Sequence, residues 1–290
     1  MNVLIVGCGY VGTALGEMLA NQGHEVWGVR RNVDALPQSI RGVAADLQDS
    51  SGLAATFARL PAMSALVYSA SPPASDEDGY ARGYGQWLEN TAAAVRSADW
   101  SLQRSLLVAS TSVYGQTDGS WVDETSPTEP NSFRGRWVLR GEQAHRDIPA
   151  AEHAAVRLAG IYGPGRTRLI DRVRTGQTVR YAAGPHYTNR IHRRDCAGVL
   201  AHLLALSGPL ESVYVGVDDA PTDHNAVVAW LAATLGVETP PERSASEAGP
   251  RMRGANKRCS NRRLRASGYD FAYPSFKEGY GALIGDASNA

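Results

Sequence analysis

A cluster of hydroxyl side chains follows an apolar run in the segment VASTSVYGQ, residues 108–116. Ser110, Thr111 and Ser112 end the run, and Tyr114 comes two positions later. Hydroxyl groups both donate and accept hydrogen bonds, so at a strand end they suit a ligand oxygen. They suit equally the local backbone, which they can cap. Two interpretations are therefore open, and under the first Thr111 and Ser112 are candidate substrate-binding residues.

Three glycines have the spacing of a phosphate-binding loop. Gly7, Gly9 and Gly12 lie in GCGYVG, after the apolar run NVLIVG and before a helical pattern. Such glycines permit a tight turn, close approach of the backbone to a pyrophosphate, and contact between helix and strand. The helix N-terminus then offers N–H groups to the phosphates. We predict a dinucleotide site that also includes Tyr10 and Val11; a purely structural turn is the alternative.

Two arginines, Arg30 and Arg31, follow in the segment WGVRRN at the end of the second expected strand. An NAD site usually has Asp or Glu here, which accepts a hydrogen bond from the ribose 2′-hydroxyl. A carboxylate would repel a 2′-phosphate, whereas guanidinium groups bind it through charge-assisted hydrogen bonds. The pair favours NADP, with NAD as the alternative cofactor; a solvated surface pair is the other interpretation.

Residues after the third and fourth expected strands complete the predicted cofactor site. The segment ADL ends the third strand, and Asp46 could accept a hydrogen bond from the adenine amino group. Capping of a helix over 49–59 explains Asp46 equally well. Leu47 lies beside it, and Ser69 and Ala70 follow the fourth strand.

Strands and helices alternate along the chain that carries these residues. Apolar runs predict strands within 2–7, 25–30, 41–47, 64–70, 105–110, 154–160 and 212–217. Helical spacing predicts helices within 10–23, 49–59, 80–98, 132–147 and 224–236. Alternation of this kind indicates parallel βαβ units with right-handed crossovers. The fold class is therefore α/β, a doubly wound, Rossmann-type parallel sheet with ligands at the carboxyl ends of its strands.

The pattern loosens after Gly160 into segments rich in glycine and proline. We predict a nucleotide-binding domain over 1–160 plus about 189–217. A smaller, interleaved substrate domain would comprise about 161–188 and 218–290, with a short helix capped by Ser260.

Charge and cysteine content exclude several classes of protein. Lys+Arg and Asp+Glu both number 29, so nothing indicates a general affinity for nucleic acid or anionic membranes. We interpret the late basic residues as a solvated face; they are Arg251, Arg253, Lys257, Arg258, Arg262, Arg263 and Arg265.

Three scattered cysteines suit neither a disulfide framework nor a zinc site. No run reaches the roughly 18 apolar residues of a membrane helix, and the first strand begins too near Met1 for a signal peptide. We expect a cytoplasmic protein without a metal.

Together these segments resemble the extended short-chain dehydrogenase/reductases, the superfamily of nucleotide-sugar epimerases and dehydratases. The matching segments run nearly end to end: GCGYVG, ADL, STSVYG, RLAGIYGPG, NRIHRRDCAGVL and VYVGVDDAP. The ending at 260–283 is closer to an atypical group known as NAD-dependent epimerase/dehydratase. The resemblance implies an NAD(P)-dependent protein acting on a small polar or sugar-like molecule, and homodimers are common among its members.

The resemblance also implies roles for single residues. Ser110, four positions before Tyr114, matches the Ser or Thr that hydrogen-bonds the substrate oxygen beside the nicotinamide. The family's YxxxK motif is missing, because the matching segment FRGRWVLRGE places Arg134 at the Tyr position and Val138 at the Lys position. Arginine stays protonated and valine has no donor, so neither replaces its counterpart. Arg134 remains a candidate for binding substrate.

Three residues are candidate replacements for the missing proton donor. Tyr114 lies near Ser110 in sequence, and Tyr162 follows the sixth strand in a glycine-rich loop that is expected near the nicotinamide and the substrate. His192 is the side chain best matched to proton transfer near neutral pH, although it could simply brace a strand. Two functions follow: an oxidoreductase with a non-standard proton donor, or an inactive dinucleotide-binding sensor or scaffold.

Overall fold

The computed structural model describes residues 1–182, 184–244 and 256–288. The chain forms two compact units. Unit 1 comprises Met1–Val113, Pro130–Arg157 and Cys196–Tyr214, and unit 2 comprises Tyr114–Glu129, Leu158–Asp195 and Val215–Ala290. The chain therefore passes several times between the units, and residues 114–129 belong to the second of them.

Unit 1 is built on a seven-stranded sheet with the order β12-β7-β5-β4-β1-β2-β3. Its strands are β1 (Asn2–Val6), β2 (Glu25–Arg30), β3 (Arg41–Ala44), β4 (Ala65–Tyr68), β5 (Leu102–Ser110), β7 (Ala150–Leu158) and β12 (Val213–Gly216). The pairs β1–β2, β2–β3, β1–β4 and β4–β5 are parallel. Because β1 lies between β2 and β4, the strand order reverses there, as in a doubly wound sheet.

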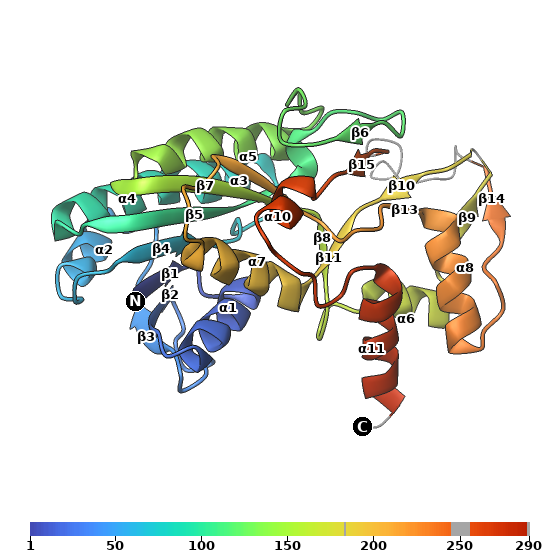
Figure 1. Cartoon of the computed structure of the whole chain (residues 1–290), viewed down its shortest axis with the longest axis horizontal. Helices are drawn as coiled ribbons and strands as arrows, with labels where there is room; N and C mark the ends of the chain where they lie inside the picture. Colours follow the sequence, from blue (N-terminus) through green and yellow to red (C-terminus); the bar gives the residue numbers. More distant parts are fainter. Residues whose placement is uncertain (183, 245–255, 289–290) are drawn as a thin grey trace. The chain divides into compact units, whose positions relative to one another are not determined.

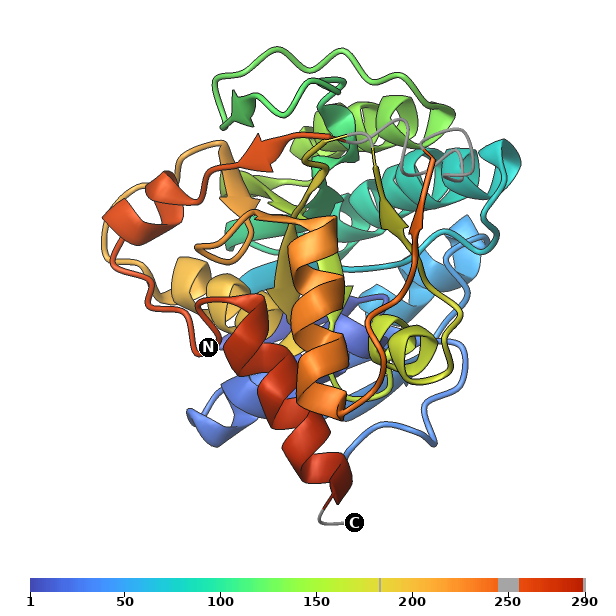
Figure 2. The same cartoon turned by 90° about the vertical axis from the view of Figure 1, so that its right-hand side faces the viewer.

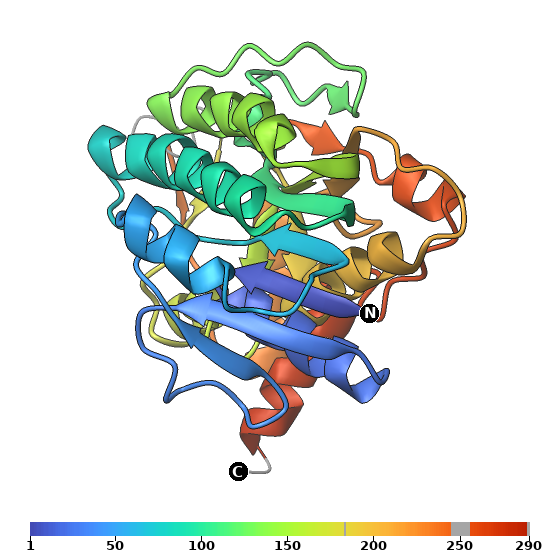
Figure 3. The same cartoon turned by 90° about the vertical axis from the view of Figure 1, so that its left-hand side faces the viewer.

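Helices cover both faces of this sheet. They are α1 (Tyr10–Asn21), α2 (Ser50–Phe57), α3 (Glu77–Ala81), α4 (Trp87–Ala98), α5 (Phe133–Ala144) and α7 (Arg193–Ala205). The helices α2, α4 and α5 lie on one face, and α1 and α7 lie on the other (Figures 1 and 3). Strand residues such as Leu4 and Leu66 are fully buried as a result. The near-continuous apolar runs of these strands reflect that two-sided burial.

The helix expected over 80–98 is present, but it begins at Glu77 and is not α-helical throughout. The structure has α3, then a π-helical turn η1 (Arg82–Gln86), then α4. The hydroxyl of Tyr68 donates to the carbonyl of Gly83 at 2.7 Å. A Cβ atom on Gly83 would lie 2.9 Å from the Cα of Pro72. These contacts with distant residues accompany the wider turn, and a helical pattern does not reveal them.

Two helix caps differ from those considered from the sequence, Asp46 as one of two alternatives and Ser260 as a prediction. The cap of α2 is Asp49, whose Oδ1 accepts from the N–H of Gly52 at 2.9 Å. Asp46 instead accepts from the N–H of Gln48, three residues too early to cap that helix. In unit 2, the helix α10 (Arg262–Ala266) has Asn261 rather than Ser260 at its N-cap.

Unit 2 contains helices and short strands joined in pairs. The helices besides α10 are α6 (Arg168–Arg174), α8 (His224–Leu235) and α11 (Phe276–Ser288). The strands are β6 (Trp121–Val122), β8 (Gly160–Tyr162), β9 (Arg180–Tyr181), β10 (Tyr187–Thr188), β11 (Arg190–His192), β13 (Thr222–Asp223), β14 (Glu242–Arg243) and β15 (Arg258–Cys259). Side chains of α6, α8 and α11 form one apolar core, and α8 and α11 lie side by side (Figure 2).

The late basic residues do not form one solvated face. Lys257 is buried, and its Nζ donates to the carbonyl of Tyr114 at 2.9 Å. The guanidinium of Arg258 lies over the rings of Trp121 and Tyr187, at 5.1 and 4.7 Å. Arg265 forms ion pairs with two carboxylates, those of Asp219 and Asp270. Arg251 and Arg253 lie outside the described residues.

Among the helices that the structure describes, none combines the length and the apolar character needed to cross a membrane.

Candidate nucleotide-binding site

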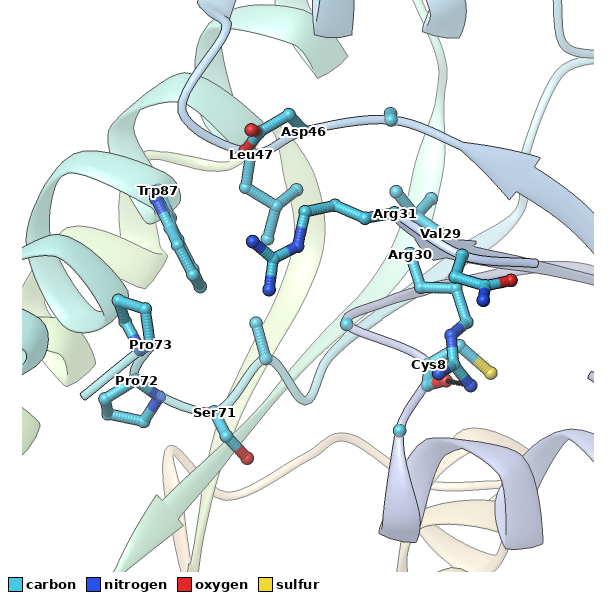
Figure 4. Close-up of a pocket in the computed structure, with 15 residues that line it drawn as sticks. Cys8, Val29, Arg30, Arg31, Asp46, Leu47, Ser71, Pro72, Pro73 and Trp87 are labelled. Atoms are coloured by element: carbon cyan, nitrogen blue, oxygen red, sulfur yellow. Dashed lines mark hydrogen bonds between the residues drawn. The ribbon is translucent and has the colours of Figure 1, made fainter. Parts of the chain in front are cut away.

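A cavity of about 580 Å³ lies in unit 1, at the carboxyl ends of β1 to β4 (Figure 4). Four segments and one helix line it: Gly7–Gly9, Val29–Asn32, Ala45–Leu47, Ala70–Pro73, and Trp87 of α4. This edge of the sheet, where the strand order reverses, is where doubly wound folds bind their ligands. Residues predicted from four separate stretches of sequence therefore meet at one cavity.

The three glycines of the loop meet different surroundings. Gly7 has a φ of +77°, and a Cβ atom there would lie 2.2 Å from the Cα of Ala70. A Cβ atom on Gly12 would lie 2.8 Å from the Oγ of Ser69. Gly7 and Gly12 thus allow the end of β4 to pack against the loop. A Cβ atom on Gly9 would meet nothing closer than 3.8 Å, so this glycine leaves free space beside the cavity.

The N-terminus of α1 has the properties of an anion-binding site. Its N-cap residue is Gly9, which offers no side-chain cap, and the first turn contains no acidic residue. Tyr10 and Val11 begin the helix. The Oγ of Ser69 donates to the carbonyl of Gly7 at 3.0 Å and holds the loop in place. Backbone N–H groups and the helix dipole at such an end attract phosphate.

The two arginines of the cavity differ in their contacts. Arg30 donates from Nη1 to the carbonyl of Cys8 at 3.4 Å, a long hydrogen bond. The guanidinium of Arg31 extends into the cavity (Figure 4). No hydrogen bond or ion pair of Arg31 is found within residues 1–182, 184–244 and 256–288. Asp46 is the one carboxylate among the lining residues, so the cavity carries net positive charge.

Part of the cavity wall was not predicted from the sequence. Trp87, Pro72 and Pro73 form an apolar wall together with Leu47, a predicted residue. Figure 4 shows these four side chains on the side of the cavity away from Arg30. The two prolines lie only two and three positions after the predicted Ala70, so the sequence already indicated that they lie near the cavity. Trp87 was expected only as part of a helical stripe, because its place in the cavity depends on how α4 packs.

The hydroxyl cluster begins at the carboxyl end of β5. The Oγ of Ser110 accepts from the N–H of Ser112 at 3.2 Å, and Thr111–Val113 form a 3₁₀ turn, η2. This hydrogen bond is the local backbone contact that the sequence allowed. The hydroxyl proton of Ser110 can still be donated to a ligand oxygen.

Helix α5 carries the two residues at the positions of the missing Tyr and Lys. Val138 is buried in the core of unit 1. Arg134, in the first turn, donates from Nη2 to the carbonyl of Ser75 at 3.0 Å. A Cβ atom on its neighbour Gly135 would lie 2.3 Å from the carbonyl oxygen of Ser112, so α5 packs closely against η2.

The three candidate proton donors lie in unit 2 and are buried. Burial, and then the nearby carboxylate of Asp218, raise the pKa of Tyr162 far above its ordinary value. His192 accepts from the N–H of Arg194 at 3.2 Å, and burial followed by the charges of two arginines lowers its pKa to about 4. Tyr114 accepts the hydrogen bond of Lys257 through its carbonyl. At neutral pH, therefore, His192 is uncharged and Tyr162 holds its proton firmly.

A second cavity, of about 1090 Å³, lies within unit 2. Its charged lining is mainly basic and consists of Arg166, Arg168, Arg172, Arg190 and one acid, Asp171. Asp171 already accepts from Thr167 and pairs with Arg174. The arrangement suits an anionic group on a ligand.

Comparisons with known proteins agree with the fold. Residues 3–215 match the model of the NAD dependent epimerase/dehydratase family. The chain is 28% identical to the protein YeeZ of Escherichia coli over 282 residues, which cover 94% of this chain and 96% of YeeZ. A solved structure from Methylobacillus flagellatus, provisionally assigned as an NAD-dependent epimerase/dehydratase, is 34% identical with a TM-score of 0.82 and covers 99% and 98% of the two chains. Human epimerase family protein SDR39U1, solved with NADPH, shares the fold at 23% identity and a TM-score of 0.75, with 96% and 97% covered.

Proposed function

Because the chain belongs to the NAD dependent epimerase/dehydratase family, we propose that it is an NADP(H)-dependent oxidoreductase for a small polar or sugar-like substrate. The dinucleotide would lie along the cavity of unit 1, with its pyrophosphate at the N-terminus of α1. Asp46 and Leu47 would contact the adenine.

The observation that carries the choice of NADP(H) is the pair of arginines at the end of β2. Arg31 reaches into the cavity without a protein partner among the described residues, and no carboxylate ends that strand. A 2′-phosphate would supply the missing partner through charge-assisted hydrogen bonds. With NAD(H), the guanidinium would find only a neutral hydroxyl.

The catalytic role that we propose for the protein is to hold the substrate and exclude water while hydride is transferred. Ser110 would hydrogen-bond the reacting oxygen. The proton would come from water or from a non-standard residue, since α5 offers Arg134 and Val138 in place of Tyr and Lys. The basic cavity of unit 2 favours a substrate with an anionic group.

A second candidate function is an inactive dinucleotide-binding protein, a sensor or scaffold. Helix α5 supports it, because Val138 is buried and Arg134 is already bonded to the backbone of Ser75. Neither residue is poised to transfer a proton. Both functions require the same cofactor cavity, so cofactor binding is tested first.

The test is a titration of the protein with NADPH and NADH, followed by fluorescence or calorimetry. We expect tighter binding of NADPH, and the Arg31→Ala variant should lose about ten- to a hundredfold in NADPH affinity with little change for NADH. Arg59→Ala is the matched control, because Arg59 is an exposed arginine that follows the end of α2 and lies outside the cavity. Equal affinity of the unmodified protein for both cofactors would refute the preference for NADP(H).

A further inference from the structure

The first turn of α5 contacts the segment that continues from one wall of the nucleotide cavity. Arg134 bonds the carbonyl of Ser75 at 3.0 Å, and its guanidinium lies 5.1 Å from the ring centre of Phe133 and 5.9 Å from that of Tyr80. These three interactions hold one side chain in one place. Phe133 precedes Arg134 in the same helix, and Tyr80 belongs to α3, so the guanidinium links two helices to the backbone at Ser75.

Ser75 belongs to the segment that connects β4 to α3, and the first part of that segment, Ser71–Pro73, lines the cavity. The segment also contacts the glycine loop through Ser69 and Ala70, and α3 and η1 through its later residues. A Cβ atom on Gly79 would lie 2.4 Å from the carbonyl oxygen of Ala74, and one on Gly83 would lie 2.9 Å from the Cα of Pro72. Because Gly79 and Gly83 have no side chains, α3 and η1 can pack closely against this segment. Arg134 adds a hydrogen bond from α5.

We propose that Arg134 is a positioning residue for the dinucleotide: by holding Ser75 it fixes the adjoining residues Ser71–Pro73, which line the cavity, and it takes no part in proton transfer. The proposal rests on the proposed function only in requiring that the cavity binds NADPH. The position that matches the family's proton donor thereby supports cofactor binding from outside the cavity. A guanidinium suits this role, because it stays charged at every working pH and keeps its donors available for the carbonyl.

The test compares variants for NADPH binding in the absence of any substrate, so that a role in substrate binding cannot contribute. We expect Arg134→Ala to weaken NADPH binding about three- to tenfold, as the loss of one partly exposed hydrogen bond would. Arg134→Lys should recover part of this, since an ammonium can still donate to the carbonyl of Ser75. The recovery should be incomplete, because the contact of the guanidinium with the ring of Phe133 is lost.

Arg136→Ala is the matched control. Arg136 lies two residues away in the same helix and is exposed, and within the described part of the chain its guanidinium pairs with Glu77, at 4.0 Å. Hydrogen exchange of residues 71–76 supplies a second readout: it should be faster in Arg134→Ala than in Arg136→Ala, and NADPH should slow it in the wild-type protein.

Two negative outcomes are distinguishable. If the wild-type protein binds NADPH and Arg134→Ala binds it as tightly as Arg136→Ala does, the positioning role is wrong while the cofactor assignment stands. If the wild-type protein binds neither NADPH nor NADH, the proposed function fails and the positioning role fails with it. If the Arg134→Ala variant does not fold, the Arg134→Lys variant alone provides the test. If Arg134→Lys has the NADPH affinity of the wild type and the same hydrogen exchange at residues 71–76, the planar guanidinium makes no contribution and that part of the proposal is wrong.

Discussion

A buried carboxyl group with one unpaired oxygen lies in unit 2. Asp218 is 2% exposed; its Oδ1 accepts from the N–H of Ala220, and its Oδ2 has no partner among the described residues. The guanidinium of Arg190 and the carboxylates of Asp219 and Asp195 act on it through space. Burial raises the pKa of Asp218 to about 7, and Arg190 offsets part of that effect. The group therefore changes charge near neutral pH.

The raised pKa predicts how the stability of the protein depends on pH. The folded state holds the proton of Asp218 up to about pH 7, whereas the unfolded chain releases it near the ordinary aspartate pKa of 3.8. The stabilisation from keeping this proton is complete below the lower value and is lost as the pH rises through the higher one. Burial of the charged form then destabilises the fold at alkaline pH.

We expect Asp218→Asn to raise the free energy of unfolding at pH 8 by roughly 1–3 kcal/mol, because a neutral amide replaces a buried charge. The gain should shrink as the pH falls towards 5. Denaturant unfolding at several pH values measures it. Asp270→Asn is the control, since that carboxylate is almost fully exposed. A difference between Asp218→Asn and wild type that does not vary from pH 5 to pH 8 would contradict this assignment.

At the scale of elements, the loop between β1 and α1 contains two glycines with different roles. One is required by the fold, and the other leaves space for a ligand. Gly7 has a positive φ and lies against Ala70, so any side chain there is strained and collides with backbone. Gly9 has a φ of −104° and open space around a Cβ atom. Its small size therefore serves the cavity rather than the fold.

We predict that Gly9→Val abolishes measurable NADPH and NADH binding, because the side chain would occupy space next to the pyrophosphate. Its thermal midpoint should stay near that of the wild type. Gly208→Val is a matched control, as Gly208 also has open space and no positive φ but lies outside the cavity. Wild-type cofactor affinity in Gly9→Val would mean that the nucleotide binds elsewhere.

Gly7→Ala, by contrast, should lower the free energy of unfolding by about 1–3 kcal/mol.

At the scale of the whole molecule, the two units carry cavities of different character. Unit 1 has the glycine loop and the paired arginines of a dinucleotide site, and unit 2 has a larger cavity lined by four arginines. A protein that only senses a dinucleotide needs the first cavity alone. The basic cavity of unit 2 is therefore the feature that favours an enzyme with an anionic substrate.

Turnover distinguishes the two functions. A panel of carbonyl, imine and nucleotide-sugar compounds is incubated with the protein and NADPH, and the absorbance of NADPH is followed. If the protein is an enzyme, Ser110→Ala should lower the rate on the order of a hundredfold while leaving the NADPH affinity nearly unchanged, as the loss of one preorganised donor does. No oxidation of NADPH with any compound, and no change of ligand affinity in Ser110→Ala, would favour the sensor or scaffold.

The sequence alone determined the parts of the fold that depend on neighbouring residues. Apolar runs located the strands of the sheet, and GCGYVG located the turn between β1 and α1. Parallel strands place their carboxyl ends at one edge. The residues that follow β1 to β4 therefore had to meet, and Gly7, Arg31, Asp46 and Ala70 do line one cavity.

The tertiary structure decided whatever depends on contacts between distant segments. Trp87 reaches the nucleotide cavity through the packing of α4, and Arg134 bonds Ser75 across 59 positions of the chain. The hydroxyl of Tyr162 is buried against Gly279 of α11, and Lys257 is buried where the sequence predicted a solvated charge. A local pattern reports which residues share a strand or a helix face. It does not report which distant segment covers a side chain. Burial by such a segment decides whether a tyrosine, a lysine or an arginine can bind a ligand or transfer a proton.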